Sequence, residues 1–222
     1  LVFAFLLVTL GRFADQYGRK RLMMIGMVVF SAGSLLCAMA DIISNATGTS
    51  AINWLIGFRI LQGVGAAGLN PISLAIIIAV FPANKRGAAI GVWGALSGLA
   101  SAFGPVLGGF LVENFDWRYI FFVNLPLCII GLIMIGLFVP ETHNSRVSKH
   151  IDIPGMLFLM ITIFCLVLAF IQGNIWGWSS SIIISLFAGS IVGLVLFILV
   201  ELKQKEPIVD FSLFKIVSFT GA

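Results

Sequence analysis

A stripe of polar side chains runs along the apolar segment Trp54–Phe81. At about 100° per residue, Arg59, Gln62 and Asn70 fall on one face of a helix, within an arc of roughly 80°. A guanidinium inside a membrane span costs about 2.5–3.5 kcal/mol to insert, so it normally faces a bundle interior or a water-filled cavity. The alternative is that Arg59 extends back to the interface near Trp54. The polar residues that continue the face favour the interior orientation.

A second group of chemically active residues lies in a short basic segment near the start of the chain. Gly11 and Gly18 permit positive-φ turns, which predicts a tight loop between two helices. Asp15 lies among several cations, where it can pair with Arg19 or cap a helix start. Lys20 continues the basic run. The alternative is an ordinary solvated basic loop without a specific role.

The third group is a face of small residues in the segment Ala88–Val112. Its members share one side of the predicted helix and are Gly94, Gly98, Ser101, Pro105 and Gly108. Small residues let helix backbones approach closely, and the Gly104-Pro105 pair predicts a kink. Static packing is the alternative interpretation. The kink within a small-residue face favours a helix that slides or bends against its neighbour.

The sequence contains no cluster of the Asp, Glu, His and Cys residues that could act as a catalytic or metal-binding group. Every Asp and Glu falls in a predicted loop, and the two histidines, His143 and His150, share one loop. The three cysteines lie in separate apolar runs, which gives no disulfide framework and no metal-ligand spacing. A membrane enzyme needs a cluster of such groups at one face. The sequence therefore predicts no enzyme activity, no metal and no cofactor.

The composition places these groups in a membrane. Of 222 residues, 60% are apolar and 10% are charged, and the mean hydropathy is +1.12. An ordinary soluble domain is about 45–50% apolar and about 25% charged. A soluble fold of this size could not bury so much apolar surface. A soluble enzyme is therefore excluded, and an all-α integral membrane protein is expected.

Apolar runs of about 20 residues are long enough to cross a bilayer. The sequence predicts six complete spans, at Leu22–Ala40, Trp54–Phe81, Ala88–Val112, Tyr119–Pro140, Ile153–Gln172 and Ser181–Val200. The last two are joined by an interfacial turn over 173–178. Two partial spans, Leu1–Leu10 and Ile216–Ala222, lie at the ends. We therefore expect the chain to be a piece of a larger polytopic protein that transports nothing alone.

Charge and tryptophan distribution predict the orientation of the spans. Eleven of the 13 basic residues lie in alternate loops: Arg12, Arg19, Lys20, Arg21, Lys85, Arg86, Arg146, Lys149, Lys203, Lys205 and Lys215. The positive-inside rule makes these loops cytoplasmic. Four tryptophans then lie at the outer interface: Trp54, Trp117, Trp176 and Trp178. The formal net charge of +4 is thus explained by topology, and a nucleic-acid partner is not expected.

Four motifs together carry a family resemblance. They are Gly11-x-x-x-Asp15-x-x-Gly18-Arg19-Lys20, Leu55-x-x-x-Arg59-x-x-Gln62-Gly63-x-Gly65, Gly104-Pro105-x-x-Gly108-Gly109, and Trp117-Arg118 followed by Asn124-x-Pro126. In this order they resemble the major facilitator superfamily, specifically its drug:proton antiporter branch. The third motif is similar to the one that marks antiporters, and the fourth resembles the start of their sixth span.

The segment after Tyr119–Pro140, the span that would correspond to the family's sixth, resembles the fourteen-span subtype, which includes multidrug exporters. A long cytoplasmic loop would follow in twelve-span members, whereas here a short loop leads into two extra spans. The resemblance divides the chain into an incomplete N-terminal bundle (1–140), a short cytoplasmic loop (141–152), two linker spans (153–200) and the beginning of the C-terminal bundle (201–222). The chain would run from late in span two to the start of span nine.

The resemblance also implies a mechanism. Two helical bundles would rock about a central site, with Asp15 and Arg19 in a cytoplasmic latch and Arg59 coupling proton movement to that change. The Gly104-Pro105 helix would be the deformable element. Protons, a small amphipathic substrate and lipid would be the partners, with other efflux components in a Gram-negative envelope. A bacterial inner or plasma membrane location is implied; a carrier of another solute is the alternative.

Overall fold

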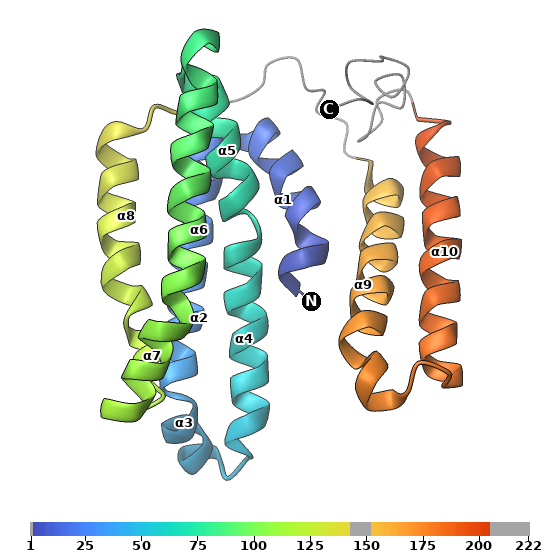
Figure 1. Cartoon of the computed structure of the whole chain (residues 1–222), viewed down its shortest axis with the longest axis horizontal. Helices are drawn as coiled ribbons and strands as arrows, with labels where there is room; N and C mark the ends of the chain where they lie inside the picture. Colours follow the sequence, from blue (N-terminus) through green and yellow to red (C-terminus); the bar gives the residue numbers. More distant parts are fainter. Residues whose placement is uncertain (1, 143–151, 205–222) are drawn as a thin grey trace. The chain divides into compact units, whose positions relative to one another are not determined.

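The computed structural model describes residues 2–142 and 152–204, which are almost entirely helical (Figure 1). The chain divides into two compact units, a first one made of residues 2 and 6–144 and a second one made of residues 1, 3–5 and 145–222. The predicted partial span Ile216–Ala222 and both histidines lie outside the described residues. Each unit is described by itself.

The first unit contains eight helices among its described residues. They are α1 (Val2–Tyr17), α2 (Arg19–Ala38), α3 (Ala40–Thr47), α4 (Ala51–Ala67), α5 (Leu69–Val80), α6 (Ala83–Asn114), α7 (Tyr119–Phe122) and α8 (Asn124–Phe138). The second unit holds α9 (Ile153–Trp176) and α10 (Ser181–Glu201). Six helical segments of the described chain are long and apolar enough to cross a membrane. The all-α membrane fold expected from composition is thus confirmed.

The predicted loop between Gly11 and Arg21 is wrong in its extent. Gly11 lies inside α1, which continues to Tyr17 because no helix-breaking residue follows Gly11 before Gly18. Gly18 is the single residue between α1 and α2, and its φ of 112° is the left-handed conformation that favours glycine. The connection is therefore one residue long, much tighter than expected.

Helices also extend beyond several predicted boundaries. The turn between the last two spans is shorter than expected: α9 continues to Trp176, and Gly177, at φ 84°, begins the reversal. Glu201 is the last residue of α10 and is buried, and Asp15 and Asp41 also lie in helices. The expectation that every acidic residue lies in a loop is therefore wrong, because the helices run past their apolar cores into the charged flanks.

The tightest packing in the first unit joins α2 to α4. A Cβ at Gly33 would lie 2.7 Å from the backbone nitrogen of Gln62, and a Cβ at Gly65 would lie 2.7 Å from the carbonyl oxygen of Gly26. Real Cβ atoms essentially never approach that closely. Glycine at Gly33 and Gly65 therefore lets the two backbones touch, as small residues do between membrane helices.

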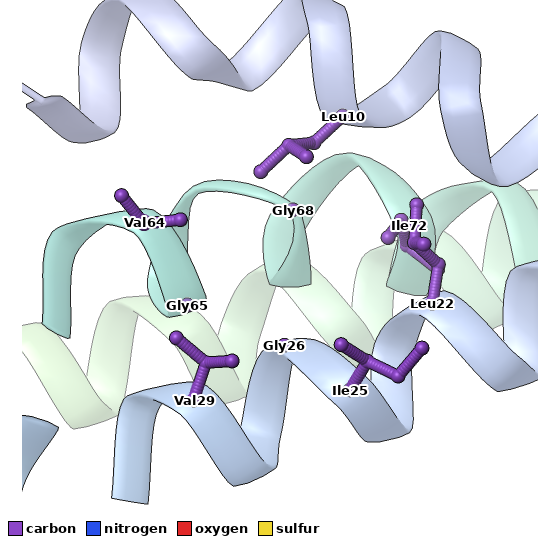
Figure 2. A pocket seen from close by; sticks show the side chains of 9 residues that line it. All are labelled: Leu10, Leu22, Ile25, Gly26, Val29, Val64, Gly65, Gly68 and Ile72. Carbon is purple, nitrogen blue, oxygen red and sulfur yellow. The ribbon is translucent and has the colours of Figure 1, made fainter. Parts of the chain in front are cut away.

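A small apolar cavity of about 90 Å³ lies beside this contact (Figure 2). Its walls come from α1, α2, α4 and α5, and the glycines Gly26, Gly65 and Gly68 form part of them. Leu10 of α1 approaches from the side opposite α2. Packing of α1 continues nearby, where buried Ala14 contacts Ile72 and Ile76 of α5. The N-terminal helix is thus anchored on α5.

The second unit is an antiparallel pair, α9 and α10 (Figure 1). Ser180 caps α10 by accepting a hydrogen bond from the Ile183 N–H at 3.3 Å. In the middle of the pair, the Ser190 hydroxyl donates to the Thr162 carbonyl at 3.1 Å. Such a bond between helices satisfies a polar group that lipid could not.

We predict that Gly65→Ala destabilises the full-length protein by roughly 1–3 kcal/mol, because the added methyl meets backbone that cannot move aside. Gly57→Ala is the matched control on the same helix, since a Cβ there meets nothing within 4 Å. The control should be neutral, or stabilise by up to about 1 kcal/mol through helix propensity. Thermal unfolding in detergent measures both; equal midpoints would contradict the close α2–α4 contact.

Candidate functional site

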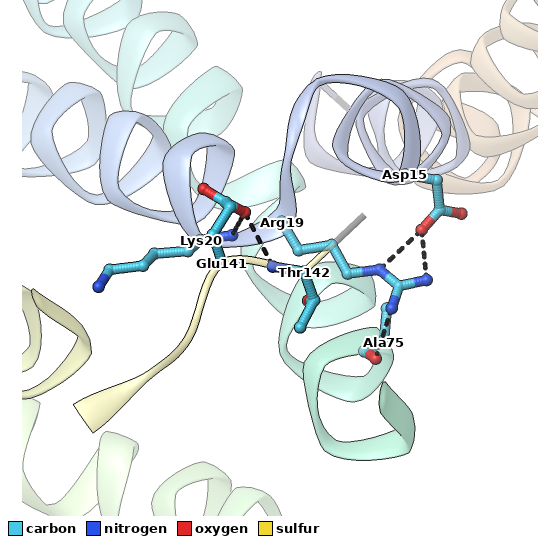
Figure 3. A network of polar contacts seen from close by, with 6 residues as sticks. All are labelled: Asp15, Arg19, Lys20, Ala75, Glu141 and Thr142. Atoms are coloured by element: carbon cyan, nitrogen blue, oxygen red, sulfur yellow. Dashed lines mark hydrogen bonds and ion pairs between the residues drawn. The ribbon is translucent and has the colours of Figure 1, made fainter. Parts of the chain in front are cut away.

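An arginine–aspartate pair connects α1 and α2 at the end of the bundle that carries Arg19 and Lys20, called here the basic end (Figure 3). Arg19 donates from Nε and Nη2 to Oδ1 of Asp15, at 2.8 and 2.7 Å. Its Nη1 donates to the Ala75 carbonyl of α5 at 3.2 Å. The pairing of Asp15 with Arg19 expected from their spacing is present. It also reaches a third helix, which the sequence did not indicate.

Glu141, which follows α8, is a residue that the sequence analysis missed. Its carboxylate accepts a hydrogen bond from the backbone N–H of Lys20 at 3.0 Å (Figure 3). It accepts a second from the backbone N–H of Arg21 at 3.2 Å. The Arg19 N–H donates to the Thr142 carbonyl at 2.9 Å. A carboxylate at a helix N-terminus satisfies free N–H groups and complements the helix dipole. Glu141 thus caps α2 from a segment about 120 residues away.

The same cap explains why Gly18 is glycine. A Cβ at Gly18 would lie 2.8 Å from Oε1 of Glu141, in addition to the strain of its positive φ. Lys20 extends to the other side, where Nζ donates to the Gly136 carbonyl of α8 at 2.8 Å. Four of the helices therefore meet at the basic end through α1, α2, α5 and α8 contacts.

Inside the bundle, a buried serine brings together two of the predicted site residues. Gln62 of α4 donates from Nε2 to the Ser34 hydroxyl at 2.5 Å, and Asn124 of α8 donates from Nδ2 to the same oxygen at 3.2 Å. Ser34 lies on α2 and is fully buried. The sequence assigned Gln62 and Asn124 to different motifs, and it did not single out Ser34.

Arg59 lies one helical turn from Gln62 on α4. Its guanidinium carbon is 4.8 Å from the centre of the Phe121 ring of α7, a cation–π arrangement. No ion pair to Arg59 is found among the described residues. Gly63 follows on α4. Arg59 and Asn70 are both exposed in the described bundle, and Asn70 lies beyond the interruption at Gly68. The predicted polar face is therefore continuous from Arg59 to Gln62, and Asn70 is not part of that contact group.

A separate ion pair closes the opposite end of the bundle. Arg118 donates from Nη2 to Oδ2 of Asp41 at 2.6 Å, and its Nη1 is 3.7 Å from Asp116. The guanidinium also lies 5.6 Å from the Trp117 ring. Pro126 is in the first turn of α8, where a missing N–H does no harm. The start of the Tyr119–Phe138 span is thereby joined to α3, a partner the sequence did not reveal.

The small-residue face of α6 has no partner within the described residues. A Cβ would meet nothing within 4 Å at Gly94, Gly98, Gly104, Gly108 or Gly109. The helix continues through Pro105 without interruption, and its residues are not buried. One bond ties it to the bundle, from Trp93 Nε1 to the Ser73 hydroxyl at 3.1 Å. The expected close helix packing on this face is thus not seen in this part of the chain.

Comparisons with known proteins agree with this architecture. The family model described as Major Facilitator Superfamily matches residues 1–199. Multidrug resistance protein 3 of Bacillus subtilis is 37% identical over 206 residues, which cover 92% of this chain and 38% of that protein. Riboflavin transporter RibZ of Clostridioides difficile is 36% identical over 214 residues, covering 95% of this chain and 43% of that protein.

A third relative extends the alignment over the whole chain. The Methylenomycin A resistance protein of Bacillus subtilis is 36% identical over 225 residues, covering 100% of this chain and 46% of that protein. The chain thus spans less than half the length of these relatives. With a family match over nearly all its residues and six apolar helices of spanning length, the chain belongs to the Major Facilitator Superfamily and is a multi-pass membrane protein.

Proposed function

We propose that the full-length protein is a secondary active transporter, not an enzyme, and that it exports drugs or other small amphipathic compounds in exchange for protons by alternating access. The relatives named for multidrug and methylenomycin resistance support export of foreign compounds. Proton entry supplies about 2.3 kcal/mol per charge per 100 mV, enough to drive a substrate against its gradient.

The observation that carries this proposal is the environment of Arg59. Its charge lies in an apolar helix, and its guanidinium lies over an aromatic ring rather than beside a carboxylate of the described residues. A fixed cation favours the charged form of any carboxylate that comes near it. A proton-carrying carboxylate that approached Arg59 would release its proton, and one that moved away would regain it. Movement of α4 relative to such a group would couple proton transfer to conformational change.

The arrangement at the basic end supports a latch in the same mechanism. Asp15, Arg19 and Glu141 join α1, α2, α5 and the end of α8 through charged hydrogen bonds. Charge-assisted hydrogen bonds are stronger than neutral ones but exchange readily with water when exposed. Such a cluster can hold one state of a transporter and release it. We propose that it stabilises the outward-facing state from the cytoplasmic side.

The remaining assignments follow from this proposal. The basic end would face the cytoplasm of a bacterial cell, in the inner or plasma membrane. The first unit would be the N-terminal bundle and the α9–α10 pair the linker spans, with α6 as the hinge helix. Protons, a small-molecule substrate and lipid would be the partners, with other efflux components where the envelope is Gram-negative.

A carrier of another solute is the second candidate. The relative named a riboflavin transporter is about as similar to this chain as the relative named for multidrug resistance, at 36% and 37% identity. Overall similarity in this region therefore does not select the cargo. The residues that face the substrate in the complete protein would decide between the two.

We predict that Arg59→Ala abolishes gradient-driven transport, because the cation that controls the proton-carrying group is lost. The measurement is uptake of a cationic dye by inverted vesicles that contain the full-length protein, as a pH gradient is imposed and collapsed. Lys85→Gln, which removes an exposed cation outside this group, is the control and should retain wild-type uptake. Wild-type uptake that ignores the gradient would refute proton exchange and favour the other-solute carrier.

We also predict that Glu141→Gln weakens the latch. Loss of the carboxylate at the N-terminus of α2 should lower stability by about 1 kcal/mol, measured by thermal unfolding in detergent. Asp15→Asn should act in the same direction by weakening the Arg19 pair. Glu113→Gln, at an exposed site near the C-terminal end of α6, is the matched control and should cause no loss. A similar loss in all three variants would argue against a specific cap.

A further inference from the structure

We propose that Ser34 is a positioning residue that fixes Arg59 in the geometry needed for coupling. This inference rests on the proposed transport function. In this proposal, a serine within the apolar helix α2 fixes the positions of α4 and α8 along its own helix. Two adjacent layers of contacts join these residues, one between α2, α4 and α8 and the other between α2, α4 and α7.

The polar layer consists of Ser34, Gln62 and Asn124. The hydroxyl oxygen of Ser34 accepts one amide hydrogen bond from α4 at 2.5 Å and a second from α8 at 3.2 Å. A hydroxyl oxygen has two acceptor lone pairs, so both are occupied by protein donors. Ser34 and Gln62 are buried, and water cannot easily replace the bonds. One atom thus fixes two helices.

The second layer is displaced from the first by three residues on each segment and consists of Cys37, Arg59 and Phe121. Cys37 follows Ser34 on α2, whereas Arg59 precedes Gln62 on α4 and Phe121, on α7, precedes Asn124. Buried Cys37 of α2 packs in one cluster with the Phe121 ring. The Arg59 guanidinium carbon lies 4.8 Å from the centre of the same ring. Residues three apart lie on the same helix face. A shift of α4 or α8 at the polar layer would therefore also move Arg59 and the Phe121 ring.

The backbone contact between α2 and α4 strengthens this coupling. A Cβ at Gly33, the residue before Ser34, would lie 2.7 Å from the backbone nitrogen of Gln62. At that distance α4 has little freedom to rotate about its axis while the Ser34 bond is kept. Arg59 has no ion pair among the described residues, so its direction depends on these neighbours. The hydroxyl oxygen of Ser34 binds both the α4 segment that carries Arg59 and the α8 segment that follows Phe121.

Ser34→Ala tests this proposal, because a methyl group cannot accept either amide hydrogen. Ser34→Thr keeps the acceptor oxygen. Ser31→Ala is the matched control on the same helix, since the Ser31 hydroxyl is buried and forms no hydrogen bond with the described residues. All variants are made in the full-length protein, and gradient-driven dye uptake is normalised to the amount of folded protein.

We expect Ser34→Ala to lower gradient-driven uptake about tenfold and to move its pH dependence toward that of Arg59→Ala. Ser34→Thr and Ser31→Ala should stay within about twofold of wild type. A role in folding alone would change the amount of folded protein and leave the pH dependence of each folded molecule in place. Wild-type pH dependence in Ser34→Ala would therefore overturn the proposal, as would equal loss in Ser34→Thr.

A second measurement is independent of transport. In a full-length variant whose only cysteine is Cys37, labelling by N-ethylmaleimide reports how tightly the second layer is closed. Labelling should rise severalfold with Ser34→Ala and remain unchanged with Ser31→Ala. Unchanged labelling with Ser34→Ala would overturn the positioning role. If wild-type uptake proves independent of the gradient, the proposed function fails while this labelling still decides whether Ser34 holds the layer together.

Discussion

The backbone contact between α2 and α4 is the constraint on which the other interactions of the first unit depend. Between membrane helices there is little hydrophobic driving force, so association relies on close packing and on hydrogen bonds between helices. Gly33 and Gly65 allow that packing, because any side chain there would meet the backbone of the other helix. The same approach brings the Gln62 amide to the Ser34 hydroxyl. A steric property of two glycines therefore determines where the polar face of α4 points.

Helix α2 is held at three levels, and the chemistry differs between them. At the basic end, the Glu141 carboxylate accepts from N–H groups that the helix itself leaves free. In the middle of α2, the contacts are hydrogen bonds between neutral groups, because the side-chain amides of Gln62 and Asn124 donate to the Ser34 hydroxyl. Just beyond the other end, Asp41 of α3 pairs with Arg118. The contacts around α2 thus involve ionised groups near the ends and neutral polar groups between them, as expected where burying a charge costs far more than burying a satisfied dipole. The charge of Arg59 is the exception on α4, where it lies over the Phe121 ring.

Local sequence features predicted a substantial part of this structure. Run length gave the spanning helices, because a span needs a minimum number of apolar residues. The short separation of Asp15 and Arg19 gave their pair, although the pair joins two helices across Gly18 and does not lie within one helix. Glu141 was missed because its partners are the backbone N–H groups of a distant helix, which leave no sequence pattern. Ser34 was missed because a serine in an apolar run looks like any other small residue until its donors are known. Gly11 was misplaced because a glycine does not stop a helix when the following residues favour it.

The glycines of α6 differ from those of α2 and α4 because they allow no close contact between helices in the described bundle. At Gly33 and Gly65, backbone atoms of the neighbouring helix occupy the space where a side chain would lie. At the α6 glycines, that space is open in the described bundle. Among the described residues α6 contacts α5 and α7, with the Trp93–Ser73 hydrogen bond as its polar link. Glycine lowers helix propensity, and Pro105 removes one backbone hydrogen bond. Bending the middle of α6 would therefore disturb few buried contacts within this bundle. Few contacts within its own bundle and a sequence that resists bending weakly thus coincide in α6, and both support the proposal that it is the deformable element.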